Sequence, residues 1–212
     1  MQIVKLAATV AALALGSVVH AGTVTRDAAP YAVGADVTTA FSGVTLTRQK
    51  YLPGGALVVS PVIIADCTTF GICSLAGPLK AFGGTAYNLA HFRDCYNAAL
   101  IGIVSSQCAI PHNVLSAEFN APTDFVEFTA TWGYDAPVMI AYDAAGNQLA
   151  QCFSGTCIGS IHIPTQNHLG TIRITSSVPN IKRVIVGAFS GSSQITGIQY
   201  NTPSRWCVSP KQ

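Results

Sequence analysis

Trp132, Tyr134 and Asp135, in the stretch TWGYDAP (131–137), come nearest to a binding site by type and spacing. Sugar rings stack on aromatic faces, while their hydroxyl groups need directional partners such as a carboxylate. The alternation of the preceding segment directs Trp132 inward, whereas Tyr134 follows the strand end and is the better ligand contact. These residues predict a glycan site, with Trp132 as either a core residue or a stacking platform.

Signals for catalysis are scarce. The chain has no G-x-S-x-G motif, and no local pattern links a serine to His91, His112, His162 or His168. Distant residues can still assemble a triad, so an unrecognised hydrolase remains a third alternative. The sequence assigns no catalytic residue and favours a protein that is not an enzyme.

Signals for metal binding are also weak. His162 and His168 flank IPTQN with no carboxylate or cysteine between them, which favours solvated histidines over metal ligands. We expect no cofactor. A structural calcium ion is the alternative, because calcium needs only oxygen ligands and backbone carbonyls leave no trace in a sequence. The candidate carboxylates are scattered singly, at Asp36, Asp124, Asp135 and Asp143.

The first 21 residues read as a secretory signal. Lys5 precedes an apolar stretch from Leu6 to Leu15 that is short for a membrane span, and Val19-His20-Ala21 suits cleavage before Gly22. An uncleaved anchor is the alternative. We therefore expect a secreted or periplasmic protein, with a single domain over residues 22–212 and no transmembrane segment after cleavage.

Charge argues against a nucleic-acid partner. Removing residues 1–21 from the 212 leaves 191, and Lys5 is lost with them, so ten Lys and Arg face nine Asp and Glu. Phosphate binding needs clustered cations, and Lys182-Arg183 is the one adjacent basic pair. We expect this pair to lie on a solvated strand edge.

The cysteines predict disulfides, because exported proteins oxidise their thiols where geometry allows. Spacings of C-x5-C and C-x4-C do not resemble the C-x2-C knuckles of zinc sites. Proximity suggests three pairs, but other connectivities stay open. Cys207 is left over as a free thiol or an intermolecular bridge. The suggested pairs are Cys67–Cys73, Cys95–Cys108 and Cys152–Cys157.

Two-residue alternation dominates the chain and predicts strands. It is clear in VTLTR (44–48), LSAEF (115–119), FVEFTATW (125–132), SIHI (160–163) and TIRIT (171–175). The continuously apolar runs 57–65 and 182–189 predict strands covered on both faces. Segment 138–152 predicts a hairpin whose apex, Asp143 to Asn147, is explained by turn chemistry. Short strands separated by Gly, Pro and Asn favour an all-β, antiparallel sandwich.

Residues 66–112 have irregular periodicity and four cysteines. A structureless stretch this long is unusual inside a compact domain. We therefore expect a disulfide-rich insertion with one or two short strands near 100–104 and a brief helix near 87–93.

Four segments resemble exported bacterial β-sandwich proteins found upstream of PEP-CTERM sorting tails. They are DVTTAFSGVTLT (36–47), FNAPTDFVEFTA (119–130), IAYDAAGNQLA (140–150) and IRITSSVPNIKRVIVG (172–187). The resemblance covers about residues 36–65 and 113–200, and implies a jelly roll similar to galactose-binding-like modules. It brings no catalytic residues. The ending NTPSRWCVSPKQ (201–212) contains no Pro-Glu-Pro sorting tail.

Together these features favour an extracellular, non-catalytic module that binds a glycan or surface polymer. The alternative is a structural or matrix protein whose partner is another extracellular protein, with Cys207 as one means of contact.

Overall fold

The computed structural model describes residues 20–51, 56–66, 80–83, 86–87, 114–132, 137–153, 156–158, 169–188 and 192–203. These residues form strands and turns, and no helix occurs among them. In particular, none of the described segments is a helix that could cross a membrane. The predicted all-β class is therefore confirmed.

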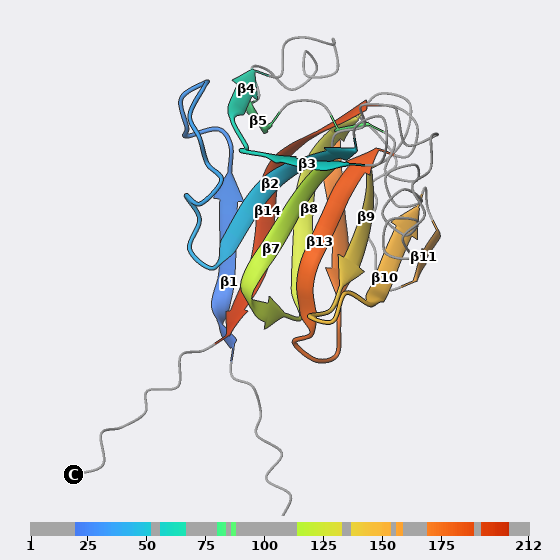
Figure 1. Ribbon diagram of the computed structural model, residues 1–212. Coiled ribbons are helices and arrows are strands. Elements are labelled where there is room, and N and C mark those ends of the chain that lie inside the picture. The colour runs from blue at the N-terminus through green and yellow to red at the C-terminus, as the bar shows by residue number, and fades with distance from the viewer. Residues whose placement is uncertain are drawn as a thin grey trace, which may run out of the picture.

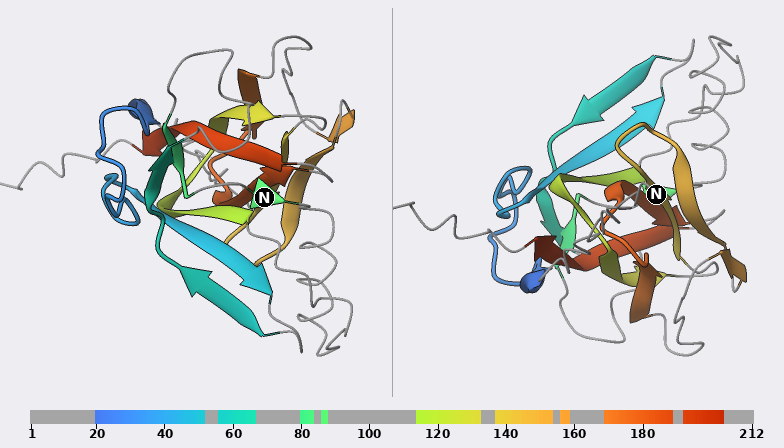
Figure 2. Two further views of the ribbon diagram at one scale, coloured as in Figure 1. Left: turned by 90° about the horizontal axis from the view of Figure 1, so that it is seen from above. Right: turned by 90° about the horizontal axis from the view of Figure 1, so that it is seen from below.

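Two antiparallel sheets face each other as the layers of a sandwich (Figures 1 and 2). The five-stranded sheet has the order β1-β14-β8-β12, and β6 also pairs with β14. Its strands are β1 (His20–Asp27), β6 (Ala86–Tyr87), β8 (Phe125–Trp132), β12 (Leu169–Thr175) and β14 (Ser192–Pro203).

The seven-stranded sheet has the order β11-β10-β9-β13-β7-β2-β3, and a small hairpin, β4-β5, stands apart from both sheets. Figure 2 shows β2 and β3 diverging from the five-stranded sheet at one margin. The strands are β2 (Val44–Tyr51), β3 (Leu57–Ser60), β4 (Ile64–Asp66), β5 (Lys80–Phe82), β7 (Val114–Thr123), β9 (Pro137–Tyr142), β10 (Gln148–Phe153), β11 (Thr156–Ile158) and β13 (Ile181–Ala188).

The core lies between the sheets and is built by the predicted alternation. Val126, Phe128 and Ala130 of β8 are completely buried, and Ile172 and Ile174 of β12 lie beside them. From the other sheet, Leu46 and Phe119 point into the same core. The inward residues predicted in segments 44–48, 115–119, 125–130 and 171–175 are thus confirmed, whereas the side chain of Trp132 and segment 160–163 lie outside what the structure describes.

Tyr200 of β14 anchors the loop before β2 to this core. Its ring lies 5.3 Å from that of Phe119, and its hydroxyl donates to the carbonyl of Ser42. Burial raises the pKa of Tyr200. The phenol is therefore a hydrogen-bond donor that holds two distant segments together.

The apolar runs have different outcomes. Val184, Ile185 and Val186 of β13 are all buried, so this part of the run at 182–189 is covered on both faces as predicted. The prediction for 57–65 was wrong. That segment divides into β3 and β4, and β3 is a terminal strand with Leu57 43% and Val59 55% exposed. Pro61, which cannot donate to a ladder, follows β3 directly.

The predicted hairpin joins β9 and β10. Asp143 Oδ1 accepts from the backbone N–H of Ala145 at 2.9 Å and of Asn147 at 2.8 Å, and Gly146 has φ 86°. Hydrogen bonds from the Asn147 side chain and backbone hold the pKa of Asp143 below its usual value. The acidic apex is fully accounted for as a turn.

The expectation that Lys182-Arg183 lies on a solvated strand edge was wrong, because β13 is a central strand between β9 and β7. Only Lys182 separates Ile181 from Arg183, whereas residues 119–122 separate their partners Thr123 and Glu118 on β7. This irregularity takes carbonyl groups out of the ladder.

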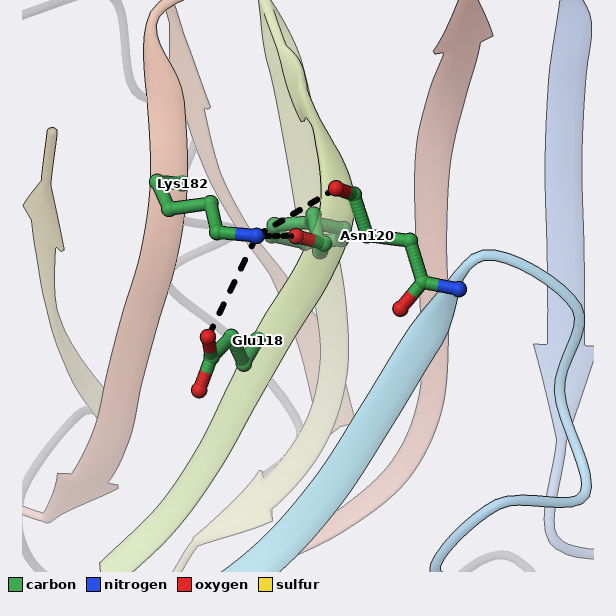
Figure 3. A network of polar contacts seen from close by, with 4 residues as sticks. Glu118, Asn120 and Lys182 are labelled. Carbon is green, nitrogen blue, oxygen red and sulfur yellow. Dashed lines mark hydrogen bonds and ion pairs between the residues drawn. The ribbon is translucent and has the colours of Figure 1, made fainter. Parts of the chain in front are cut away.

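The Lys182 ammonium supplies the missing donors (Figure 3). Its Nζ lies 2.5 Å from the carbonyl oxygen of Phe119 and 3.3 Å from that of Asn120. The Glu118 carboxylate is 3.9 Å away and 62% exposed. Lys182 is therefore a structural cation that compensates for the bulge.

Candidate binding face on the five-stranded sheet

The predicted aromatic site is located only in part. Trp132 is the last residue of β8 and is the ladder partner of Ser193 in β14. Tyr134 and Asp135 lie outside the described residues. Their role in ligand binding stays a prediction, placed by chain continuity just after β8.

Of the predicted disulfide cysteines, the structure describes Cys152 and Cys157. Cys67, Cys73, Cys95, Cys108 and Cys207 lie outside the described residues, as do segment 100–104 and, apart from Tyr87 in β6, the expected helix.

One predicted cysteine pair is aligned by the backbone. Cys152 of β10 and Cys157 of β11 are direct ladder partners. Direct antiparallel partners have Cα atoms about 4.5–5.5 Å apart, which lies within the range that a disulfide spans.

The predicted calcium ligands do not converge. No group of three potential metal ligands occurs in the described part of the chain. Asp36 accepts from the backbone N–H of Thr38 at 2.8 Å, which lowers the pKa of Asp36. Asp124 accepts from the Asn201 amide at 2.9 Å. Asp143 holds its own turn, and Asp135 lies outside the described residues.

A different set of polar side chains gathers on the outward surface of the five-stranded sheet. Because direct ladder partners point to the same side of a sheet, the register places these residues in rows across four strands. We call this surface the polar face. It consists of Thr25, Asp27, Glu127, Thr129, Thr171, Arg173 and Gln199.

The first row runs from β1 to β12 through a glycine. Asp27 is paired with Gly197, Gly197 with Thr129, and Thr129 with Thr171. A Cβ added at Gly197 would lie 2.7 Å from Asp27 Oδ1 and 3.3 Å from Thr129 Oγ1. The carboxylate and the hydroxyl thus both lie close over Gly197, which is buried beneath them, and a side chain at this position would displace them.

The second row ends in an ion pair. Gln199 is paired with Glu127, and Glu127 with Arg173. Arg173 Nε and a terminal guanidinium nitrogen lie 2.8 Å and 2.6 Å from Glu127 Oε2. The guanidinium carbon also lies 5.3 Å from the centroid of the Phe125 ring. The Arg173 side chain therefore contacts both Glu127 and Phe125.

The chemistry of the polar face suits a ligand rich in hydroxyl groups. Among the described residues, the side chains of Asp27, Thr129 and Gln199 have no hydrogen-bond partner. They offer a carboxylate acceptor, a hydroxyl that both donates and accepts, and an amide with both functions.

Sequence reasoning missed Asp27, Gly197 and Gln199 because two of the strands that carry them were not recognised. In β1 the polar alternation of Thr23, Thr25 and Asp27 was available as a signal. In β14 an irregularity between Ile195 and Gly197 interrupts the two-residue period and conceals the strand.

No protein-family model matches this chain, and no curated protein shows significant similarity to it.

Proposed function

We propose that this chain is an exported, non-catalytic module that binds a glycan or surface polymer through the polar face. The observation that carries the proposal is the row of Asp27, Gly197 and Thr129, where two polar side chains without a hydrogen-bond partner among the described residues close over a glycine. Sugar hydroxyls need paired donors and acceptors. The predicted contacts Tyr134 and Asp135 follow β8, the strand that carries Thr129, and extend this surface in our proposal.

The proposed jelly roll is supported by the strand order. The eight strands β1, β7, β8, β9, β10, β12, β13 and β14 pair first with eighth, second with seventh, third with sixth and fourth with fifth. This nested pairing is that of one long hairpin rolled into two sheets. Residues 28–113, which contain strands β2–β6, then form an insertion between β1 and β7, and the predicted cysteine-rich segment 66–112 lies within it. The resemblance to PEP-CTERM-associated domains stays a prediction.

Export predicts a disulfide between Cys152 and Cys157, which the ladder register favours. We expect mass spectrometry of the unreduced secreted protein to find these two residues in one linked peptide pair. In the chain-entropy model so short a loop contributes about 2 kcal/mol, so reduction lowers the melting temperature by several degrees. Free thiols at both positions would contradict the prediction, and Cys152→Ser with Cys157→Ser is the matched variant.

Gly197→Ala tests the proposed function most directly. The new methyl group meets Asp27 Oδ1, the end of a flexible side chain, so the fold is retained while the face is obstructed. We expect binding to immobilised neutral polysaccharides to weaken at least about tenfold, which corresponds to about 1.4 kcal/mol. The melting temperature should be unchanged.

Two variants complete this experiment. Thr129→Val removes only the hydroxyl and should weaken the same binding. Thr45→Ala changes a polar residue on the outward face of the other sheet, opposite Glu118, and should bind normally. Wild-type binding by Gly197→Ala, or no polysaccharide bound by the wild type, would refute the proposed function.

A structural role through protein contacts is the second candidate. It is favoured by β3, whose Leu57 and Val59 expose 43% and 55% of their surface on a terminal strand. Terminal strands that lack charge and proline are open to pairing with another chain.

A further inference from the structure

Arg48 and Lys50 share one side of β2. This strand lies at the margin where the two sheets diverge (Figure 2). Along this side of the strand Val44 and Leu46 are buried, whereas Arg48 and Lys50 are only half-buried. The side of β2 that is buried at Val44 and Leu46 therefore carries two positively charged side chains farther along the strand. Their Cα atoms are about 7 Å apart, because a strand rises 3.2–3.4 Å per residue.

The Arg48 side chain packs over a glycine but has no polar partner among the described residues. A Cβ on Gly83 would come within 2.6 Å of Arg48 Cδ, and Gly83 has φ 75°, a conformation that favours glycine. Neither the Arg48 guanidinium nor the Lys50 ammonium makes a hydrogen bond or ion pair within the described part of the chain. Burial lowers the pKa of Arg48.

Most other cations in the described segments have a hydrogen-bond or ion-pair partner, unlike Arg48 and Lys50. Lys80 donates to the carbonyl oxygens of Ala29 and Tyr31, Lys182 to those of the bulge, and Arg173 to Glu127. A half-buried charge without a counterion costs free energy. Such a group marks a candidate functional site when no structural partner accounts for it.

We propose that Arg48 and Lys50 form a second binding site, for the carboxylate groups of an acidic polysaccharide. The planar guanidinium fork matches a carboxylate, and the ammonium two residues along contacts a neighbouring acid group. Both edges of β2 are already paired, with β7 and β3. The strand therefore offers no main-chain hydrogen bonds to an extended peptide, which favours a polymer recognised by its charges.

The test uses the mature chain with polygalacturonate as the probe, and dextran and poly-L-glutamate for comparison, in calorimetry at low salt. We expect Arg48→Met to weaken polygalacturonate binding at least about tenfold, and Arg48→Lys to weaken it less because the charge is kept without the fork. Lys50→Met should also weaken binding. Gly197→Ala should leave polygalacturonate binding intact, which separates this site from the polar face.

Stability distinguishes binding from a structural role. Removal of a half-buried charge that has no partner in the described part of the chain should leave the melting temperature of Arg48→Met unchanged or raise it. A fall of several degrees would make Arg48 a structural residue and overturn the proposal. Polygalacturonate binding that survives Arg48→Met, or that is no stronger than dextran binding, would also overturn it. Tighter Arg48-dependent binding of poly-L-glutamate would assign the site to an acidic peptide instead.

Discussion

Lys182→Met lowers the free energy of unfolding by about 2–3 kcal/mol, because hydrogen bonds to charged donors each contribute about 1.5–3 kcal/mol. The substitution keeps most of the apolar stem and removes the ammonium that the carbonyls of Phe119 and Asn120 share (Figure 3). For a chain of this size the melting temperature falls by about 4–12 °C. Thermal and urea unfolding measure both quantities.

Two controls separate the carbonyl contacts from charge in general. Glu118→Gln removes the exposed ion pair at 3.9 Å and should change stability by less than about 0.5 kcal/mol. Lys50→Met removes a cation without a partner among the described residues and should be equally mild. If Lys182→Met is no more destabilising than these controls, the carbonyl contacts do not stabilise the bulge.

Arg173→Met has the second large effect, because it leaves Glu127 without its counterion. Glu127 is only 8% exposed, and its Oε2 receives both contacts from Arg173. A buried charge that loses its partner costs about 3–5 kcal/mol, and we expect about 2 here because the Arg173 side chain is 43% exposed. Chemical unfolding at neutral pH provides the measurement.

The double variant Glu127→Gln with Arg173→Met isolates the charge. Its stability should recover by more than half of the loss, because no uncompensated carboxylate remains. Losses that simply add in the double variant would show that Arg173 acts through packing on Phe125 and not through Glu127.

Local patterns predicted the core because alternation and burial are coupled residue by residue. Phe128 and Ile172 were assigned inward from their neighbours alone, and both are buried. The hairpin at Asp143 to Asn147 was equally local, since its hydrogen bonds span at most four residues. Features that depend on residues so close together in the chain can be predicted from the local sequence.

The position of a strand within its sheet is not local. Lys182 was expected at an edge and is central, while the apolar run at Leu57 was expected to be covered and is terminal. Nothing within either segment encodes which strand will lie beside it. The polar face shows the same limit, because Asp27 and Gly197 become neighbours only through the pairing of β1 with β14.

The pairing of β14 between β1 and β8 also constrains how the protein folds. Among the described strands, β1 and β8 meet only through residues 192–203. Without β14, β1 has no neighbour among the described strands, so the five-stranded layer depends on pairing between segments that are far apart in the chain. The pairing of β1 with β14 joins residues 180 positions apart, and contacts of such long range slow folding.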